Sequence, residues 1–392
     1  MQGYVVAKGD RFYAVIYEGV DPITGRERRR WHAAGADRAA AERLAVVLAN
    51  EAKANERSVG LSLGRYLLET WLPAKRVNLR PSTWHGYRSI VELHVIPRVG
   101  RLPLCRLRAH HLESLYGDLL ASGRRDGKGG LDSKTVLEVH VILHKALRDA
   151  CKRGLVVRNV ASDAEAPKRR RPTGELRAWT AQQLHAFLDV ARNDRLFPAF
   201  WLAANTGMRR GELLGLRWGD VDLAGGHLSV NRSLISVGYE LHETRGKTHN
   251  SRRWIDLDDM TVAVLSRWHD ALGVELGREV TDTDHVFCTR SGDPVHPDRI
   301  TQIFTRLVAA APVPRLRLHD LRHTHATLLL KAGVPIKVVS ERLGHATPGF
   351  TMATYQHVLP GMQAEAARTF ASVIASTGFN PVEEPVEVAE AR

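Results

Sequence analysis

The sequence predicts a multidomain protein that is mainly α-helical and carries small β-sheets. Its 392 residues are more than one hydrophobic core usually organises. Apolar residues recur at helical spacing through most of the chain, whereas strand-like alternation is confined to the first 35 residues and to 226–257. A basic segment with two prolines separates two of the helical regions. We therefore expect separate domains joined by a linker.

The composition favours a folded protein with a polyanionic partner. Charged residues make up 25% of the chain, and the net charge is +13. Such an excess attracts nucleic acid, with an anionic membrane surface as the competing partner. No apolar run approaches the roughly 20 residues of a membrane span, and the N-terminus lacks a secretory pattern. Three distant cysteines argue against a disulfide framework or thiolate cluster. We expect a cytoplasmic protein.

Residues 1–57 predict a three-stranded sheet followed by a helix. The stretch "YVVAKGDRFYAVIYEG" alternates around Gly9 and Asp10, which is typical of a hairpin, and "DPITGRE" supplies a second turn. The alanine-rich stretch that follows is helical, with Asp37 as its N-cap. A basic run lies on the sheet, where a solvated surface and a DNA contact are equally good interpretations. Its central residues are Arg28, Arg29 and Arg30.

Residues 58–162 predict a unit of four helices, because four apolar-periodic stretches are separated by prolines and glycines. Residues 163–178 form a predicted basic linker, for which we expect contact with a DNA backbone. Its cationic run is Lys168, Arg169, Arg170 and Arg171.

Residues 179–376 predict a third domain of mixed α and β structure. It begins with helices, the first capped by Thr180, passes through strands between 226 and 257, and returns to helices. Residues 377–392, rich in proline and glutamate, predict an acidic flexible tail.

The stretch "LRLHDLRHTHATLLL" (316–330) places cationic groups against a run of leucines. On a helix His319, Arg322 and His323 project from one side. Three interpretations stay open: a histidine-rich helix cap, a zinc site formed by the two histidines, and a phosphate site with Arg322 as a fixed fork. The zinc interpretation lacks a third ligand and the usual glutamate. This stretch alone does not decide between them.

Other segments carry matching groups. In "TGMRRGE" a helix breaks at Thr-Gly and restarts with Arg209, which Glu212 can orient as an anion site. Lys247 lies in a turn between strands, in "KTHNSRR". His345 follows a glycine in "LGH", and Tyr355 lies ten residues beyond it, in "TYQHV". Taken singly, each of these residues has an ordinary structural explanation.

Together these positions resemble the tyrosine recombinases, the phage-integrase family. That family has an arginine after a Thr-Gly-x turn, a hairpin lysine, His-x-x-Arg, Gly-His and a tyrosine ten residues further on. This sequence fills all six positions in order, from about Trp179 to Phe370. The resemblance implies that residues 58–162 form a SAM-like core-binding domain. The N-terminal sheet and helix resemble the arm-site-binding module of integrases from temperate phages and integrative elements.

The resemblance implies a reaction that needs no metal, cofactor or ATP. Tyr355 is the expected nucleophile, forming a 3′-phosphotyrosine and releasing a 5′-hydroxyl. Arg209 and Arg322 are expected to meet the charge that develops on the non-bridging oxygens, with Glu212 in a supporting role. The covalent intermediate conserves the bond energy, so the strand can be rejoined.

The remaining roles are carried over in the same way. Lys247 is expected to protonate the leaving oxygen, and His319 to assist proton removal from the tyrosine. His345 is expected to hydrogen-bond the phosphate. His323 and His325 lie outside the family's catalytic set, and we interpret them as groups that either face the core or support the catalytic residues.

The implied partner is double-stranded DNA carrying attachment sites, bound by a homotetramer. In the family, the segment after the tyrosine packs on a neighbouring protomer, and residues 365–376 are suited to this. A directionality factor and a DNA-bending host protein are possible further partners. The alternatives are a type IB topoisomerase, a catalytically silent DNA-binding protein and, from the histidine pair alone, a zinc hydrolase.

Overall fold

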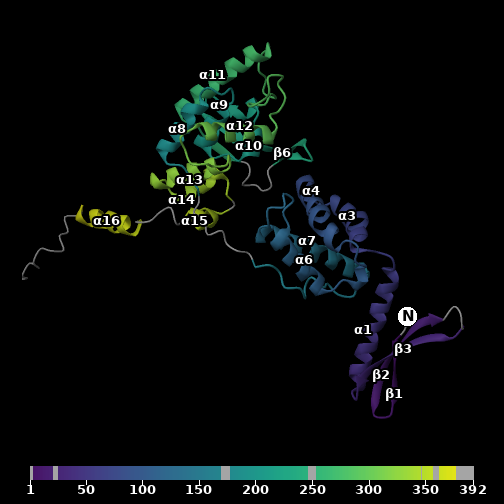
Figure 1. Ribbon diagram of the computed structural model, residues 1–392. Helices are drawn as coiled ribbons and strands as arrows, with labels where there is room; N and C mark the ends of the chain where they lie inside the picture. The colour runs from purple at the N-terminus through teal and green to yellow at the C-terminus, as the bar shows by residue number, and fades with distance from the viewer. Residues whose placement is uncertain are drawn as a thin grey trace, which may run out of the picture. The chain divides into compact units, whose positions relative to one another are not determined.

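The computed structural model describes residues 3–20, 25–168, 177–245, 253–345, 347–355 and 362–376 (Figure 1). The chain divides into two compact units, Met1–Thr173 and Gly174–Arg392. The predicted mainly helical, multidomain fold with small antiparallel sheets is confirmed. None of the described helices is long and apolar enough to cross a membrane. The predicted tail at 377–392 lies outside the described residues.

The first unit begins with an antiparallel sheet in the order β1-β2-β3, with one helix, α1, packed against all three strands. Lys8 pairs with Arg11 across the first turn, where Gly9 adopts a positive φ of 61°. The Asp37 side chain accepts a hydrogen bond from the backbone N–H of Ala39, so the predicted helix cap is present. The elements are β1 (Gly3–Lys8), β2 (Arg11–Val20), β3 (Glu27–Gly35) and α1 (Arg38–Arg57).

The rest of the first unit is helical and surrounds its own core. Trp71 and Tyr66 are fully buried there, and each donates a hydrogen bond to α7, to the Asp149 carboxylate and the Ala146 carbonyl respectively. Two of the four predicted helices contain π-helical turns. In chain order the elements are α2 (Leu63–Arg65), η1 (Tyr66–Trp71), α3 (Leu72–Arg76), α4 (Pro81–Ile90), η2 (Val91–Val95), α5 (Ile96–Val99), η3 (Leu104–Arg106), α6 (Ala109–Ser122) and α7 (Ser133–Lys152).

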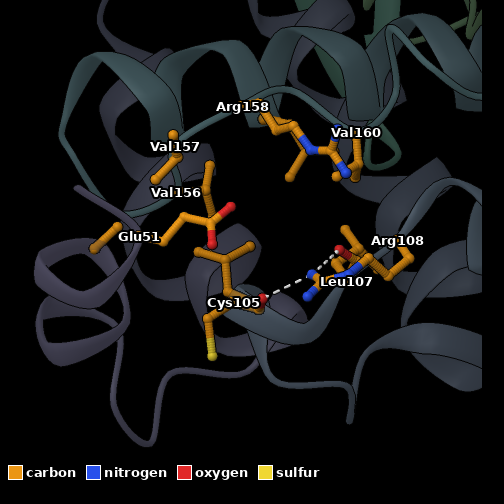
Figure 2. A pocket seen from close by; sticks show the side chains of 11 residues that line it. Glu51, Cys105, Leu107, Arg108, Val156, Val157, Arg158 and Val160 are labelled. Carbon is orange, nitrogen blue, oxygen red and sulfur yellow. Dashed lines mark hydrogen bonds between the residues drawn. The ribbon is translucent and has the colours of Figure 1, made fainter. Parts of the chain in front are cut away.

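A small pocket of about 120 Å³ lies in the first unit between α1 and the segments around η3 and residue 157 (Figure 2). Glu51, Cys105 and Arg158 line it. Arg108 is held at its edge by hydrogen bonds to the Cys105 and Leu107 carbonyls. The pocket contains none of the residues that the sequence predicts to carry chemistry.

The second unit opens with helices, continues through two small sheets and closes with helices. The sheets have the orders β4-β5-β8 and β6-β7, all antiparallel. The elements are α8 (Ala181–Ala191), α9 (Phe197–Thr206), α10 (Arg210–Gly215), η4 (Trp218–Asp220), β4 (Val221–Asp222), β5 (His227–Val230), β6 (Arg232–Val237), β7 (Glu240–Arg245), β8 (Arg253–Asp256), α11 (Asp259–Leu276), α12 (Pro297–Ala310), α13 (Asp320–Lys331), α14 (Ile336–Leu343), α15 (Pro348–Tyr355) and α16 (Met362–Ala375).

The second unit holds two apolar clusters. The larger one is rich in aromatic side chains, with Trp179, Phe187 and Phe304 in mutual contact. Thr180 caps α8 through its hydroxyl, as predicted. A smaller cluster joins α13, α14 and the end of α15, where Tyr355 packs among aliphatic side chains. Helix α13 packs against both α9 and α14, so its N-terminal residues are brought beside the loop that follows α9.

Candidate active site

The loop after α9 is shaped by a glycine. Helix α9 ends at Thr206, and Gly207 closes it in the left-handed conformation, at φ 63°. A Cβ atom at this position would lie 2.7 Å from Leu343 Cδ2 and 2.9 Å from His325 Cδ2. The predicted break at Thr-Gly is therefore confirmed, and a side chain is disfavoured by both the φ angle and the space. The turn places Arg209 at the N-cap of α10.

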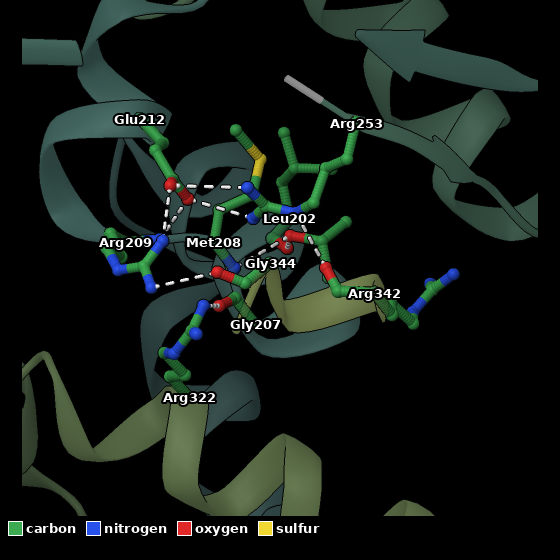
Figure 3. Close-up of polar contacts among 10 residues, drawn as sticks. Leu202, Gly207, Met208, Arg209, Glu212, Arg253, Arg322, Arg342 and Gly344 are labelled. Atoms are coloured by element: carbon green, nitrogen blue, oxygen red, sulfur yellow. Dashed lines mark hydrogen bonds and ion pairs between the residues drawn. The ribbon is translucent and has the colours of Figure 1, made fainter. Parts of the chain in front are cut away.

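Glu212 holds two arginines from different parts of the chain. Its carboxylate accepts hydrogen bonds from Arg209 Nη1 at 2.8 Å and from Arg253 Nη1 and Nη2 at 3.2 and 2.9 Å (Figure 3). Burial alone would raise the pKa of Glu212, but the hydrogen bond and charge of Arg253, then the charge of Arg209, lower it to about 2. The carboxylate is therefore ionised at neutral pH and fixes both guanidinium groups.

Arg322, on α13, lies beside the group formed by Glu212, Arg209 and Arg253. It is 4% exposed, and its Nη1 donates to the Gly207 carbonyl at 2.8 Å. Within the described part of the chain its buried Nη2 has no hydrogen-bond partner. Burial, and then the charge of Arg209, lower the pKa of Arg322 to about 9, which leaves it charged at neutral pH. Arg322 therefore has a buried donor available for an acceptor that the described residues do not supply.

The four residues Arg209, Glu212, Arg253 and Arg322, called the arginine cluster below, carry an unbalanced charge. Three guanidinium groups face one carboxylate, which leaves an excess of two positive charges. Arg209 Nη2 and Arg253 Nε donate to the backbone carbonyls of Gly344 and Arg342, which tie the cluster to the end of α14. A fixed excess of positive charge, with a buried donor that no described residue uses, is suited to binding an anion such as a phosphate.

Two predicted histidines flank the cluster. A hydrogen bond of 2.7 Å joins Nδ1 of His345 to Oγ1 of Thr351. Burial, and then the charge of Arg322, lower the pKa of His345 to about 4. His319 stands at the N-cap of α13. The residue is exposed, but neighbouring protein atoms desolvate part of its ring. This partial desolvation, and then the charge of Arg322, lower the pKa of His319. Both rings are therefore neutral at pH 7.

Tyr355 ends α15 with its side chain 1% exposed. Its hydroxyl lies 2.8 Å from Nδ1 of His323. Burial raises the pKa of Tyr355 to about 12, against the opposing effect of the Arg322 charge. No hydrogen bond joins Tyr355 to His319 in the described part of the chain, although the His319 and His323 rings are 5.4 Å apart. The tyrosine is thus beside the arginine cluster, neutral, and hydrogen-bonded to His323 of α13.

The structure brings together five of the six residues predicted to carry catalysis, and Lys247 lies outside the described residues. Arg169, Arg170 and Arg171 of the predicted linker also lie outside them, whereas Lys168 is described and exposed. Arg28, Arg29 and Arg30 are exposed on β3, where Arg29 donates hydrogen bonds to Glu27 and to the Tyr4 hydroxyl.

One residue of the site, Arg253, was not singled out from the sequence, and a second, His323, was not assigned a contact with the tyrosine. Arg253 begins β8 and meets Glu212 only through the fold, so no local spacing indicates it. His323 was interpreted as a group that faces the core or supports the catalytic residues, and its Nδ1 lies 2.8 Å from the Tyr355 hydroxyl. Its i+4 spacing from His319, on the same side of α13, is the one sequence signal for this position. His325 does lie on the core side, with its Nδ1 bonded to the Ala204 carbonyl.

The histidine pair gains no further metal ligand from the described residues around it. In the part of the chain that the structure describes, no group of three or more His, Cys, Asp or Glu side chains is arranged to hold a metal ion. A catalytic zinc site usually needs three protein ligands. The buried Nη2 of Arg322, which no described residue accepts from, favours the phosphate interpretation.

Known proteins share both the sequence pattern and the fold. The model of the phage integrase family matches residues 177–361, and that of the phage integrase N-terminal SAM-like domain matches residues 65–120. The chain is 25% identical to the ICEBs1 integrase of Bacillus subtilis over 358 residues, covering 89% of this chain and 94% of the relative.

Two solved structures extend the match to three dimensions. One is the Tn1549 transposon integrase in complex with a circular intermediate DNA, with a TM-score of 0.63 and 20% identity, covering 79% of this chain and 99% of the other. The second is a lambda integrase tetramer bound to a Holliday junction, with a TM-score of 0.55 and 18% identity, covering 88% and 96%. At these identities the likeness shows a shared fold.

Proposed function

This chain belongs to the phage integrase family of tyrosine recombinases, and from that premise we propose that it integrates or excises a mobile element by site-specific DNA recombination. The observation that carries the proposal is the buried Nη2 of Arg322, which has no partner among the described residues. It lies inside a cluster with two excess positive charges, beside the Tyr355 hydroxyl. A phosphodiester supplies the missing acceptor and the missing negative charge.

The arrangement supports attack by a tyrosine on a phosphodiester. The Tyr355 oxygen forms a bond to phosphorus, and the bond from phosphorus to the 5′ oxygen breaks. Negative charge grows on the non-bridging oxygens during this step, and Arg209 and Arg322 are held where they can meet it. His345 is proposed to hydrogen-bond the same phosphate, and Glu212 to keep the guanidinium of Arg209 in place.

Lys247 is proposed as the acid that protonates the leaving 5′ oxygen. In the sequence Lys247 lies between β7 and β8, six residues before Arg253. Arg253 belongs to the arginine cluster, and this closeness in sequence supports the assignment. A 5′-hydroxyl of another strand then attacks the phosphotyrosine, and the tyrosine leaves with its proton restored. Exchange of strands, rather than return of the same strand, makes the reaction a recombination.

The proposed partner is double-stranded DNA with attachment sites, bound by four copies of the chain. The lambda integrase relative has been solved as a tetramer on a Holliday junction. Helix α16 exposes Phe370 and Val373, an apolar face that suits packing on a neighbouring copy. The exposed arginines of β3 and Lys168 are proposed to contact DNA phosphates.

Further partners follow from the family resemblance alone. A directionality factor and a DNA-bending host protein are proposed, and the bacterial cytoplasm, where the host DNA lies, is the proposed place of action.

Covalent capture tests the proposal. The full chain is incubated with sheared DNA from the source genome and element, denatured, and the protein-linked fragments are sequenced. Tyr355→Phe should abolish capture, whereas Tyr239→Phe, which removes an exposed hydroxyl from the turn between β6 and β7, should leave it unchanged. Recovered fragments should share one short core sequence.

Two outcomes would contradict the proposal. Equal capture by Tyr355→Phe would mean that another residue makes the bond or that none is made. Tyrosine-dependent capture spread over DNA without a common core would favour a topoisomerase over a site-specific recombinase.

A further inference from the structure

The hydroxyl of Tyr355 has one described hydrogen-bond partner, and it is His323. The two atoms lie 2.8 Å apart, and the rings are 5.8 Å apart between centroids. His319 makes no hydrogen bond to the tyrosine in the described part of the chain. We propose that His323, rather than His319, takes the proton from Tyr355 as the tyrosine attacks the phosphate. This inference rests on the proposed function, because it assigns a role within that reaction.

Burial restricts where the tyrosine proton can go. The Tyr355 side chain is 1% exposed and lies in the small cluster between α13 and α14. A buried hydroxyl without an acceptor is costly, so its hydrogen is directed at Nδ1 of His323, the one acceptor that the described residues place within reach. The imidazole is then the tautomer that carries its hydrogen on Nε2. In this arrangement proton transfer requires no movement of either side chain.

The charge state of His323 suits an acceptor. Burial, then the neighbouring His319, lowers its pKa to about 4, so the ring is neutral at pH 7 with Nδ1 free to accept. The charges and titratable groups around it come from three segments. They are Arg317, His319, Asp320 and Arg322 on or just before α13, Tyr355 on α15, and His345 after α14.

Arrival of the phosphate changes this balance in the required direction. Arg322 lowers the pKa of His323 because it adds positive charge nearby. A phosphodiester bound to Arg322 offsets that charge, and the growing negative charge of the transition state offsets it further. An imidazolium at His323 therefore becomes easier to form when the reaction needs it.

The phenol proton moves to Nδ1 of His323, the oxygen electron pair forms the bond to phosphorus, and the electrons of the broken bond leave with the 5′ oxygen. That oxygen gains a proton from the general acid. During rejoining, the imidazolium returns its proton to the departing tyrosine. His319, exposed at the N-cap of α13, is then available to the phosphate.

The test measures single-turnover cleavage by the full chain. The probe is a duplex with the core sequence recovered by covalent capture, carrying a 5′-bridging sulfur at the scissile phosphate. A thiolate leaves without protonation, so the rate reports nucleophile activation and not the general acid. His323→Asn keeps an acceptor oxygen near the place of Nδ1 but cannot take a proton, and its rate should fall about a hundredfold or more.

The pH profile separates proton transfer from positioning. The parent rate should fall as the pH drops through the pKa of His323 in the DNA complex, because protonated Nδ1 cannot accept. His323→Asn should lose this limb, whereas His319→Asn should keep it at a lower overall rate. Cleavage by His323→Asn within about threefold of the parent, or loss of the limb in His319→Asn alone, would overturn the inference.

Controls distinguish this inference from the proposed function. If Tyr355→Phe still forms the covalent complex, the proposed function fails; if Tyr355→Phe is inactive and His323→Asn is not, only the inference fails. Should His323→Asn unfold, ¹⁵N-histidine NMR of folded Tyr355→Phe replaces it. Loss of the hydroxyl should shift the His323 Nδ1 signal, and an unchanged signal would overturn the inference.

Discussion

The arginines of the arginine cluster and those of strand β3 carry the same charge in opposite settings. The side chains of Arg253 and Arg322 are buried, and each donates to a carboxylate or a backbone carbonyl. Arg28 and Arg30 are exposed on a strand of a small sheet. Solvent and salt screen exposed charges, whereas buried ones act at nearly full strength over short distances.

The difference separates two uses of one residue type. Exposed arginines attract a long polyanion from many directions and tolerate replacement of any one of them. In the arginine cluster, Glu212 holds Arg209 and Arg253, and the Gly207 carbonyl holds Arg322. Loss of one clustered arginine should therefore impair chemistry, and loss of one β3 arginine should alter only binding.

The largest effect is expected at Arg322. Arg322→Ala removes the unpartnered donor and one of the cluster's charges, so single-turnover cleavage should fall about a thousandfold. Arg322→Lys keeps the charge but lacks the planar fork, and should recover only part of the rate. Gel-shift affinity for the core site should change little. A variant that cleaves normally would show that the cluster is only structural.

Glu212→Gln should lower stability, because it leaves Arg253 buried without its carboxylate. The expected loss at pH 7 is on the order of 3 kcal/mol, measured by chemical denaturation. The folded-state pKa of Glu212, about 2, lies below its ordinary value of 4.5. Its stabilisation is therefore complete above about pH 4.5 and is lost as the pH falls toward 2. The unfolding free energy of Glu212→Gln should not show this loss at low pH. Parallel curves of unfolding free energy against pH for the parent and the variant would show that the buried ion pair does not stabilise the fold.

A smaller effect is expected at Gly207, which supports Arg322 through its carbonyl. Gly207→Ala should lower the free energy of unfolding by about 1–3 kcal/mol. The positive φ angle disfavours alanine, and the added Cβ would also clash with Leu343 and His325. Gly277 ends α11 at φ 65°, and a Cβ atom there would meet no neighbour. Gly277→Ala therefore measures the effect of the positive φ angle without a clash, as a matched control. Equal thermal shifts in the two variants would show that the contacts with Leu343 and His325 are unimportant.

The smallest effect is expected on β3. Arg28→Ala should weaken DNA binding about equally for all sequences and reduce the slope of log affinity against log salt by about one. Cleavage of saturated core-site DNA should stay within about twofold of the parent. A change in the cleavage rate at saturation would remove the distinction between the two groups of arginines.

Local features of the fold were predictable from the sequence. The caps at Asp37 and Thr180 and the break after Thr206 depend on residues within three positions of one another, so short-range chemistry determines them. The position of Tyr355 within a matched motif was likewise visible. These predictions need no knowledge of how distant segments meet.

Contacts between distant segments were not predictable in the same way. The Glu212 pair with Arg253 joins residues 41 positions apart, and the His323 contact with Tyr355 spans 32. Both arise because β8, α13 and α15 converge on the loop after α9, and neither partner has a spacing that encodes the other. The π-helical turns in η1 and η2 were not predictable either, because the spacing of apolar residues does not distinguish an α-helical turn from one with an extra residue.

The shared carboxylate of Glu212 has a consequence for entropy. A free arginine side chain samples many rotamers, and immobilising such a side chain on a ligand costs roughly 0.5–1.5 kcal/mol. Arg209 is already held by Glu212 and the Gly344 carbonyl, and Arg322 by the Gly207 carbonyl. For two side chains this corresponds to about a tenfold to hundredfold gain in phosphate affinity. That ordering cost is met when the protein folds, before any DNA arrives.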